Sequence, residues 1–148
     1  MDRPDWDSYY MGIAKAVATR GTCSRLQVGA VIVRGHAVIA TGYNGSLPGW
    51  PHCDEVDPPH LLEHGHCTMA VHAEANAVAQ AARRGSCVSS GSEEVTIYTT
   101  ASPCANCFKL IASAGITRVV AGVLYRDARV LQWAKMSHVQ LEVMADAT

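Results

Sequence analysis

The order of apolar and polar residues along the chain predicts alternating helices and strands. Apolar side chains recur every three to four positions where we expect a helix, and β-branched residues gather in short runs where we expect a strand. Helical spacing covers residues 5–20, 72–84, 102–115 and 127–137. Runs typical of strands cover residues 28–34, 37–43, 94–100, 117–123 and 139–144. Glycine ends the first three helical segments, as is common at helix C-termini, at Gly21, Gly85 and Gly115.

The resulting order, αββαβαβαβ, predicts the fold class. Gly35 and His36 form a tight turn between the first two strands, which indicates a hairpin. The later strands alternate with helices, which favours parallel pairing with helices on both faces of the sheet. We therefore expect an α/β fold, a three-layer α/β/α sandwich with a mixed five-stranded sheet. A length of 148 residues fits one domain over residues 1–148.

Residues 44–66 interrupt this alternation. The segment is rich in proline and glycine and shows neither helical nor strand periodicity, so we expect a long loop. Structureless loops of this length are uncommon unless they are functional or held in place by a bound group. Four of the seven histidines lie in this loop, at His52, His60, His64 and His66. This favours a metal at the loop.

Composition narrows the classes of partner and compartment. The chain is 49% hydrophobic and 17% charged, as in globular proteins. Its net charge of −1 and the lack of a basic tail argue against binding to polymeric nucleic acid, but a single nucleotide remains a suitable ligand. No apolar run approaches the roughly 18 residues of a membrane span, and the acidic, aromatic N-terminus is unlike a signal peptide. We expect no membrane partner and a cytoplasmic location, where the six cysteines stay reduced.

The motif S-P-C-A-N-C places Cys104 and Cys107 at the start of a predicted helix, with two residues between them. At this spacing two sulfurs can bind one metal, and the positive end of the helix lowers thiol pKa values. Taken alone, the pair fits a structural zinc, a redox pair or two buried thiols.

His72 and Glu74 stand in the first turn of an alanine-rich helix, where two polar groups are unexpected. His72 supplies a third ligand, and three protein ligands leave the fourth position of a tetrahedral zinc open for water. From its position Glu74 can reach that water and move its protons. Each residue taken singly also fits an ordinary helix start. Together, however, H-x-E and P-C-x-x-C form the signature of zinc nucleobase deaminases.

Five stretches extend this signature: CSRLQVGAVIV, TGYNGSLPG, VHAEANAVAQAA, YTTASPCANCFKLIASAGI and VLYRDA. Together they resemble the deoxycytidylate (dCMP) deaminase family, including its bacterial late-competence branch, over residues 6–143. H-A-E and P-C-x-x-C also mark the wider superfamily, with its tRNA adenosine, guanine, riboflavin-pathway and free-cytosine deaminases. TGYNG and the loop rich in His and Cys point more narrowly to dCMP deaminases. Free-cytidine deaminases typically carry Cys at the position of His72.

The resemblance implies a cytidine deaminase-like fold and hydrolysis of dCMP to dUMP and ammonia. Zinc would be held by His72, Cys104 and Cys107. Glu74 would take a proton from the zinc-bound water, deliver it to N3 of the cytosine and then protonate the departing ammonia.

The resemblance also implies substrate contacts. Asn44 would contact the sugar hydroxyl, although N-G is also a simple turn former. Tyr125 would lie near the pyrimidine and the phosphate. The alternative is that it is an ordinary aromatic residue at the end of a strand. Arg25 and Arg126 are the candidate phosphate cations, unless they are merely solvated. The remaining expected substrate-binding residues are Val28, Ala30, Ala73 and Ser102.

A second zinc is expected on the same ground, because some dCMP deaminases tie the long loop to the region after the first helix with a structural metal. Its ligands would be Cys23, Cys53, His66 and Cys67, a closed Cys3His set. The alternative is small buried thiols beside solvent-exposed histidines.

The resemblance finally implies a homo-oligomer such as a hexamer, with dCTP and dTTP as effectors and Mg2+ accompanying an effector nucleotide. Two alternatives to a dCMP deaminase stay open at this point. One is a related zinc deaminase of another base or nucleotide. The other is a non-catalytic, zinc-stabilised nucleotide-binding module, against which the presence of Glu74 argues. A pI near 6.6 does not favour a tRNA deaminase.

Overall fold

The computed structural model describes residues 1–86, 88, 93–123 and 127–144. Its α-helices are α1 (Trp6–Ala18), α2 (Ala73–Arg83), α3 (Ala105–Ser113) and α4 (Ala128–Met136). Its strands are β1 (Gly29–Arg34), β2 (Ala37–Tyr43), β3 (Leu62–Glu63), β4 (His66–Cys67), β5 (Val95–Thr99), β6 (Arg118–Ala121) and β7 (Gln140–Val143). Within these ranges, no helix has the length and apolar character to cross a membrane.

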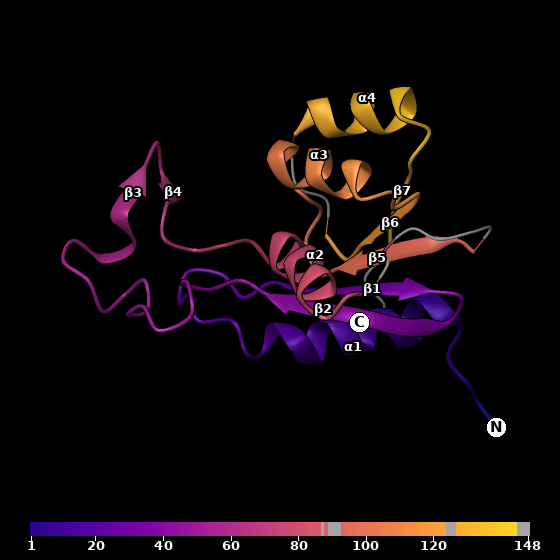
Figure 1. Ribbon diagram of the computed structural model, residues 1–148, viewed down its shortest axis with the longest axis horizontal. Helices are drawn as coiled ribbons and strands as arrows, with labels where there is room; N and C mark the ends of the chain where they lie inside the picture. The colour runs from indigo at the N-terminus through magenta and orange to yellow at the C-terminus, as the bar shows by residue number, and fades with distance from the viewer. Residues whose placement is uncertain (87, 89–92, 124–126, 145–148) are drawn as a thin grey trace.

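Five of the strands form one mixed sheet in the order β2-β1-β5-β6-β7 (Figure 1). β1 pairs antiparallel with both β2 and β5, whereas β5, β6 and β7 run parallel. The hairpin and the parallel half are therefore both confirmed. In the β1–β5 pairing Ala30 stands opposite Thr99, close to the point where β5 ends.

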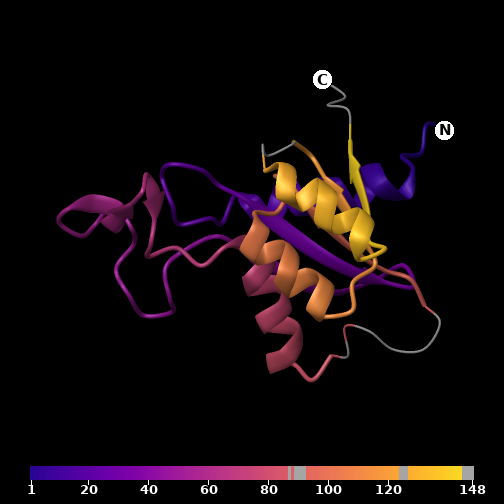
Figure 2. The same cartoon turned by 90° about the horizontal axis from the view of Figure 1, so that it is seen from above.

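Helices cover both faces of this sheet, which confirms the three-layer sandwich (Figure 2). On one face α1 packs against β1, β5 and β6 through buried residues that include Tyr10, Met11 and Val120. On the other face α2, α3 and α4 share a larger core with alternate residues of the same strands, among them Ile97 and Val119.

The alanines of α2 allow this helix to lie very close to the sheet. Ala73, Ala77 and Ala81 recur every four residues and are fully buried, as a helix face pressed on a sheet requires. A β-carbon at Gly42 of β2 would collide with the backbone of Ala73 and Ala77. The close approach fixes where α2 begins, and so where His72 stands.

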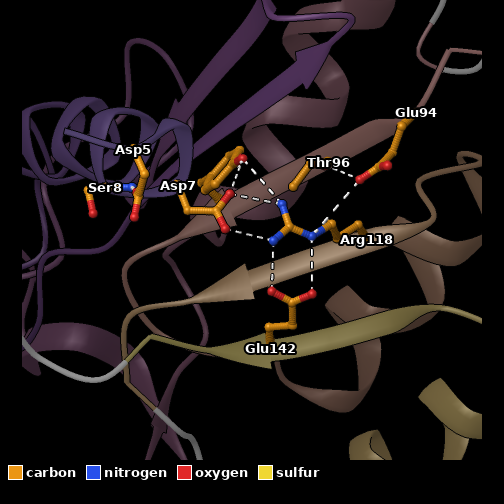
Figure 3. A network of polar contacts seen from close by, with 8 residues as sticks. Asp5, Asp7, Ser8, Glu94, Thr96, Arg118 and Glu142 are labelled. Atoms are coloured by element: carbon orange, nitrogen blue, oxygen red, sulfur yellow. Dashed lines mark hydrogen bonds and ion pairs between the residues drawn. The ribbon is translucent and has the colours of Figure 1, made fainter. Parts of the chain in front are cut away.

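Arg118 of β6 joins α1 to the edge of the sheet (Figure 3). Its guanidinium donates to Asp7 of α1 at 2.9 and 2.7 Å, and to Glu142 of β7 at 3.3 and 2.7 Å. The Tyr98 hydroxyl donates to the same Asp7 carboxylate at 2.7 Å. The hydrogen bond from Arg118 lowers the pKa of Asp7. These polar and charged contacts thus fix the position of α1 relative to β5, β6 and β7.

The long loop after β2 contains more structure than the sequence predicts. A short 3-10 helix covers Pro59–Leu61, and β3 and β4 form a two-stranded hairpin that projects from the body of the molecule (Figure 1). His64 and Gly65 both have positive φ in the turn of that hairpin, as a two-residue hairpin turn often requires. Strands of two residues are too short to produce a period-2 pattern, which is why the expectation of a plain loop is wrong here.

Candidate active site

His72, Cys104 and Cys107 come together where α2 and α3 begin. His72 is the N-cap residue of α2, and Cys104 is the N-cap residue of α3, with its sulfur accepting from the Cys107 N–H at 3.5 Å. The Nδ1 atom of His72 lies 3.5 Å from the sulfur of Cys104 and 3.3 Å from that of Cys107. The structure therefore brings the three residues together as the motifs predict.

The spacing of these three atoms fits a zinc ion. Bond lengths of about 2.3 Å to sulfur and 2.1 Å to nitrogen place neighbouring ligand atoms of a tetrahedral zinc about 3.6 Å apart. The observed separations of 3.5 and 3.3 Å are close to that value. One nitrogen and two sulfurs are also a donor set that zinc favours.

The electrostatics of the group point the same way. Hydrogen bonds from Cys107 and His72 lower the pKa of Cys104 to about 3, which makes this residue a thiolate at neutral pH. The hydrogen bond to Cys104 raises the pKa of His72. Contact with the same Cys104 thiolate, followed by burial, raises the pKa of Cys107. A bound cation would stabilise both cysteines as thiolates and remove this competition.

Glu74 lies directly beside this group and is almost completely buried, at 4% exposure. Burial raises the pKa of its carboxyl group. The Thr99 hydroxyl, at the end of β5, donates to Glu74 Oε1 at 2.9 Å. A carboxyl group with a raised pKa, in a cavity wall beside candidate metal ligands, is a typical proton-transfer group.

A cavity of about 1090 Å³ opens in front of these residues, which is ample for a nucleotide. Its walls come from the segment before β1, the loop around β4, the starts of α2 and α3, and α4. Five of the predicted substrate-binding residues line it, namely Arg25, Val28, Asn44, Ala73 and Ser102.

Ala30 does not line this cavity, contrary to expectation. It is fully buried in β1 and packs in the core shared with α2. Val28, two residues earlier, lies before the strand begins and reaches the cavity, whereas Ala30 lies inside the sheet. The other two expected contacts, Tyr125 and Arg126, fall outside the described residues.

Asn44 braces one wall of the cavity. Its Oδ1 accepts from the Val28 N–H at 2.7 Å, and its Nδ2 donates to the Leu26 carbonyl at 2.7 Å. An amide has two donor hydrogens and two oxygen lone pairs, so this bracing leaves capacity for a ligand. The residue is thus more than a turn former.

Arg25 connects the same wall to the β3–β4 hairpin. Both terminal nitrogens of its guanidinium lie 3.2 Å from the Gly65 carbonyl oxygen. Gly65, His66 and Cys67 all face the cavity. The hairpin that the sequence pattern does not reveal is therefore part of the site.

A further wall comes from α3 and α4, and the sequence analysis missed it. Asn106 and Lys109 lie one turn apart on α3, and their spacing from Cys104 could have indicated them. Arg129 of α4 is paired with Asp127 at 3.0 Å, and its guanidinium carbon lies 5.9 Å from the centre of the Trp133 ring. These residues also line the cavity, and no motif marks α4.

A second group of metal-ligand types lies in the long loop. Cys23, Cys53 and His60 place one ligand atom each within 4.8 Å of one another, and Cys67 packs against the two cysteines. The Nδ1 atom of His60 is buried and has no hydrogen-bond partner. Of the residues expected to hold a second metal, the structure groups Cys23 and Cys53, with His60 rather than His66 beside them. His66 lies on β4 and faces the cavity instead.

The family model for the cytidine and deoxycytidylate deaminase zinc-binding region matches residues 4–123. The chain belongs to this deaminase family. The matched segment contains His72, Cys104 and Cys107, which the structure brings together, and the neighbouring Glu74.

Two curated relatives match most of this chain. ComE operon protein 2 of Bacillus subtilis is 44% identical over 119 residues, covering 80% of this chain and 60% of the relative. Deoxycytidylate deaminase of Mycobacterium phage D29 is 41% identical over 130 residues, covering 81% of this chain and 96% of the relative. The chain thus spans less than two thirds of the Bacillus protein but nearly all of the phage protein.

A solved deaminase structure matches the whole fold. The crystal structure of dCMP deaminase from cyanophage S-TIM5, in complex with dCMP and dUMP, has a TM-score of 0.77 and 31% identity. The match covers 97% of this chain and 100% of that chain. The deaminase fold and the family that the sequence motifs predict are both confirmed.

Proposed function

We propose that this chain catalyses the hydrolytic deamination of dCMP to dUMP and ammonia, with zinc held by His72, Cys104 and Cys107. The observation that carries the proposal is the convergence of these three residues beside the buried Glu74 at one cavity. The names of the phage relative and of the solved neighbour with dCMP and dUMP support the choice of substrate.

The proposed chemistry exchanges the amino group on C4 of cytosine for oxygen. Zinc in this position supplies Lewis acidity, which lowers the pKa of water toward neutrality. Glu74 takes a proton from the attacking water and delivers it to N3 of the base. It then takes the second proton from the hydroxyl now on C4 and gives it to the leaving nitrogen, so that the C4–N bond breaks, the C4 carbonyl forms and ammonia departs. A carboxyl group whose pKa is raised by burial can both accept and return a proton near neutral pH.

The remainder of the nucleotide would lie along the walls described above. Asn44 contacts the sugar hydroxyl, and Val28, Ala73 and Ser102 border the base. Arg25 contacts the 5′ phosphate, because a guanidinium suits phosphate geometry and this side chain lines the cavity. The roles of Tyr125 and Arg126 stay predictions.

A substrate panel tests the proposal. Ammonia release is measured with dCMP, CMP, deoxycytidine, dCTP, guanine and adenosine, with zinc content determined on the same preparation. Turnover of dCMP above the other compounds is expected. Turnover of another compound alone would instead indicate the related zinc deaminase, and nucleotide binding without turnover would indicate the non-catalytic module.

We also propose a structural zinc at Cys23, Cys53, Cys67 and His60. Burial raises the pKa of the Cys53 thiol, and a bound metal would stabilise its thiolate form. The Nδ1 atom of His60 is buried without a hydrogen-bond partner, so a metal would satisfy it. His66 is exposed. We expect two zinc ions per chain in the wild type, one in His60→Asn, and two in the matched control His66→Asn.

Other properties implied by the family stay predictions. They are a homo-oligomer such as a hexamer, the effectors dCTP and dTTP with Mg2+, a single domain over residues 1–148, and a cytoplasmic location that keeps the thiol ligands reduced. Light scattering of the purified protein with and without each nucleotide and Mg2+ tests the assembly and the effectors together.

A further inference from the structure

Thr99 occupies an unusual position at the last residue of β5. Its side chain is fully buried, although threonine is mostly an exposed residue. Its hydroxyl lies 2.9 Å from Oε1 of Glu74 and 2.7 Å from the carbonyl oxygen of Ala101. The single hydroxyl hydrogen is shared between these two acceptors, so Thr99 contacts both the carboxylate on α2 and the backbone of the segment that leads to Cys104.

The carboxylate of Glu74 needs such a link. Its side chain has three rotatable bonds and enters the site from the start of a helix, so burial alone does not fix the direction of its oxygens. Thr99 supplies a hydrogen bond to this carboxylate from the side of the sheet. A proton-transfer group misplaced by about 1 Å can lose a large part of its rate.

Thr99 is suited to hold this group. A β-branched side chain has few χ1 rotamers, and β5 is hydrogen-bonded on both edges, to β1 and to β6. The hydroxyl is thus fixed in space by the most enclosed strand of the sheet. Because it is neutral, it can hold one oxygen of Glu74 without adding a competing charge.

We propose that Thr99 is a positioning residue for deamination. Its hydroxyl fixes Oε1 of Glu74 and so leaves the other carboxylate oxygen available to the water and the base. It also ties that orientation to the Ala101 carbonyl, and hence to the segment that positions Cys104. This inference rests on the proposed deaminase function, in which Glu74 moves the protons.

Two substitutions at this position separate the hydroxyl from the packing. Thr99→Val keeps the branched shape and removes the hydroxyl, whereas Thr99→Ser keeps the hydroxyl. The matched control is Thr96→Val on the same strand. Thr96 is also buried, and its hydroxyl donates to Glu94 at 3.4 Å, away from the site.

We expect Thr99→Val to lower kcat for dCMP about tenfold, the loss of one hydrogen bond to a charged group, with KM changed less than about twofold. Zinc content stays at the wild-type level. Thr99→Ser restores kcat to within about threefold of wild type, and Thr96→Val leaves it unchanged. A purely structural role would instead lower the melting temperature of both valine variants and leave kcat of the folded protein intact.

A second measurement does not depend on turnover. Crystal structures of the zinc-loaded wild type and variants are expected to show the Glu74 carboxylate displaced or in several rotamers in Thr99→Val, but in place in Thr99→Ser. An unmoved carboxylate in Thr99→Val, or a wild-type kcat for this variant, overturns the positioning role. A wild type without dCMP turnover refutes the proposed substrate alone, because the crystal structures still decide the position of Glu74.

Discussion

The Nδ1 atom of His72 lies 3.3 Å from the sulfur of Cys107, although 35 residues separate them along the chain. The contact forms because α2 and α3 begin close together, with His72 and Cys104 as their N-cap residues. The first turn of α2 places Glu74 beside them. The packing of α2 and α3 therefore places both the metal-ligand atoms and the proton-transfer group.

Glu74→Gln removes the proton-transfer group but keeps the shape of the side chain. We expect kcat for dCMP to fall by about 10²–10⁴-fold, the usual contribution of general acid–base catalysis, with zinc retained. Steady-state kinetics and metal analysis measure both quantities. Glu63→Gln, an exposed residue of the hairpin, is the control with wild-type kinetics. Full activity of Glu74→Gln would refute the mechanism.

Cys104→Ser removes the sulfur that lies 3.5 Å from Nδ1 of His72. We expect the zinc at this site to be lost together with activity, because a hydroxyl is a poor zinc ligand compared with a thiolate. Zinc content falls by one ion per chain in plasma emission analysis. The neighbouring exposed Asn106→Ser, which touches the cavity without a ligand atom, keeps its zinc. Unchanged zinc content in Cys104→Ser would contradict the assignment.

Arg25→Gln tests recognition of the phosphate. We expect KM for dCMP to rise about tenfold or more, while the much weaker turnover of deoxycytidine is unchanged, because only the first substrate carries the phosphate. The ratio of kcat/KM for the two substrates is the measurement. Arg20→Gln, an exposed residue after α1, is the control. An equal loss for both substrates would show that Arg25 acts only through its hydrogen bonds to Gly65.

Gly42→Ala tests the close packing of α2 on β2. A β-carbon at Gly42 collides with the backbone of Ala73 and Ala77, which cannot rotate away. We expect a loss of about 2–3 kcal/mol in the free energy of unfolding, typical of overpacking. The control is Gly12→Ala in α1, where a β-carbon meets nothing within 4 Å and where alanine stabilises a helix by up to about 1 kcal/mol. Urea denaturation would reveal opposite signs for the two variants.

Asp7→Asn tests the charged link between α1 and the sheet. The pKa of Asp7 is lowered in the folded state from a value of 3.8, so its contribution to stability is present above pH 3.8 and is lost as pH falls through the lower, folded value. We expect Asp7→Asn to lower the free energy of unfolding by about 1 kcal/mol at pH 7. The difference from wild type is constant down to about pH 5 and shrinks below 3.8. A difference that is independent of pH throughout would exclude the charge as its cause.

The sequence predicts the regular elements and the centre of the site well. The spacing of apolar residues locates the sheet and its four helices because both faces of the sheet are covered. The motif reveals Cys104 and Cys107 because two metal ligands from one helix must be close in sequence. His72 follows from its pairing with Glu74. All of these features depend on the spacing of residues that are close in the sequence, so a single sequence is enough to predict them.

Other parts of the site depend on distances that no local pattern records. Arg129 reaches the cavity only because α4 packs beside α3, and His60 approaches Cys23 only because the loop folds back on itself. Ala30 is buried within β1 and does not line the cavity, whereas Val28 lies before the strand and does. Tertiary packing, rather than propensity, determines all three.

The position of β5 has a consequence for motion. Its amide groups are hydrogen-bonded to the strands on both sides, so we expect slow amide hydrogen exchange along β5. The β3–β4 hairpin has two residues in each strand and the exposed Leu62, so we expect it to open at a lower free energy than the central strand. We therefore expect a nucleotide to enter the cavity past this hairpin while the metal ligands and Glu74 stay in place.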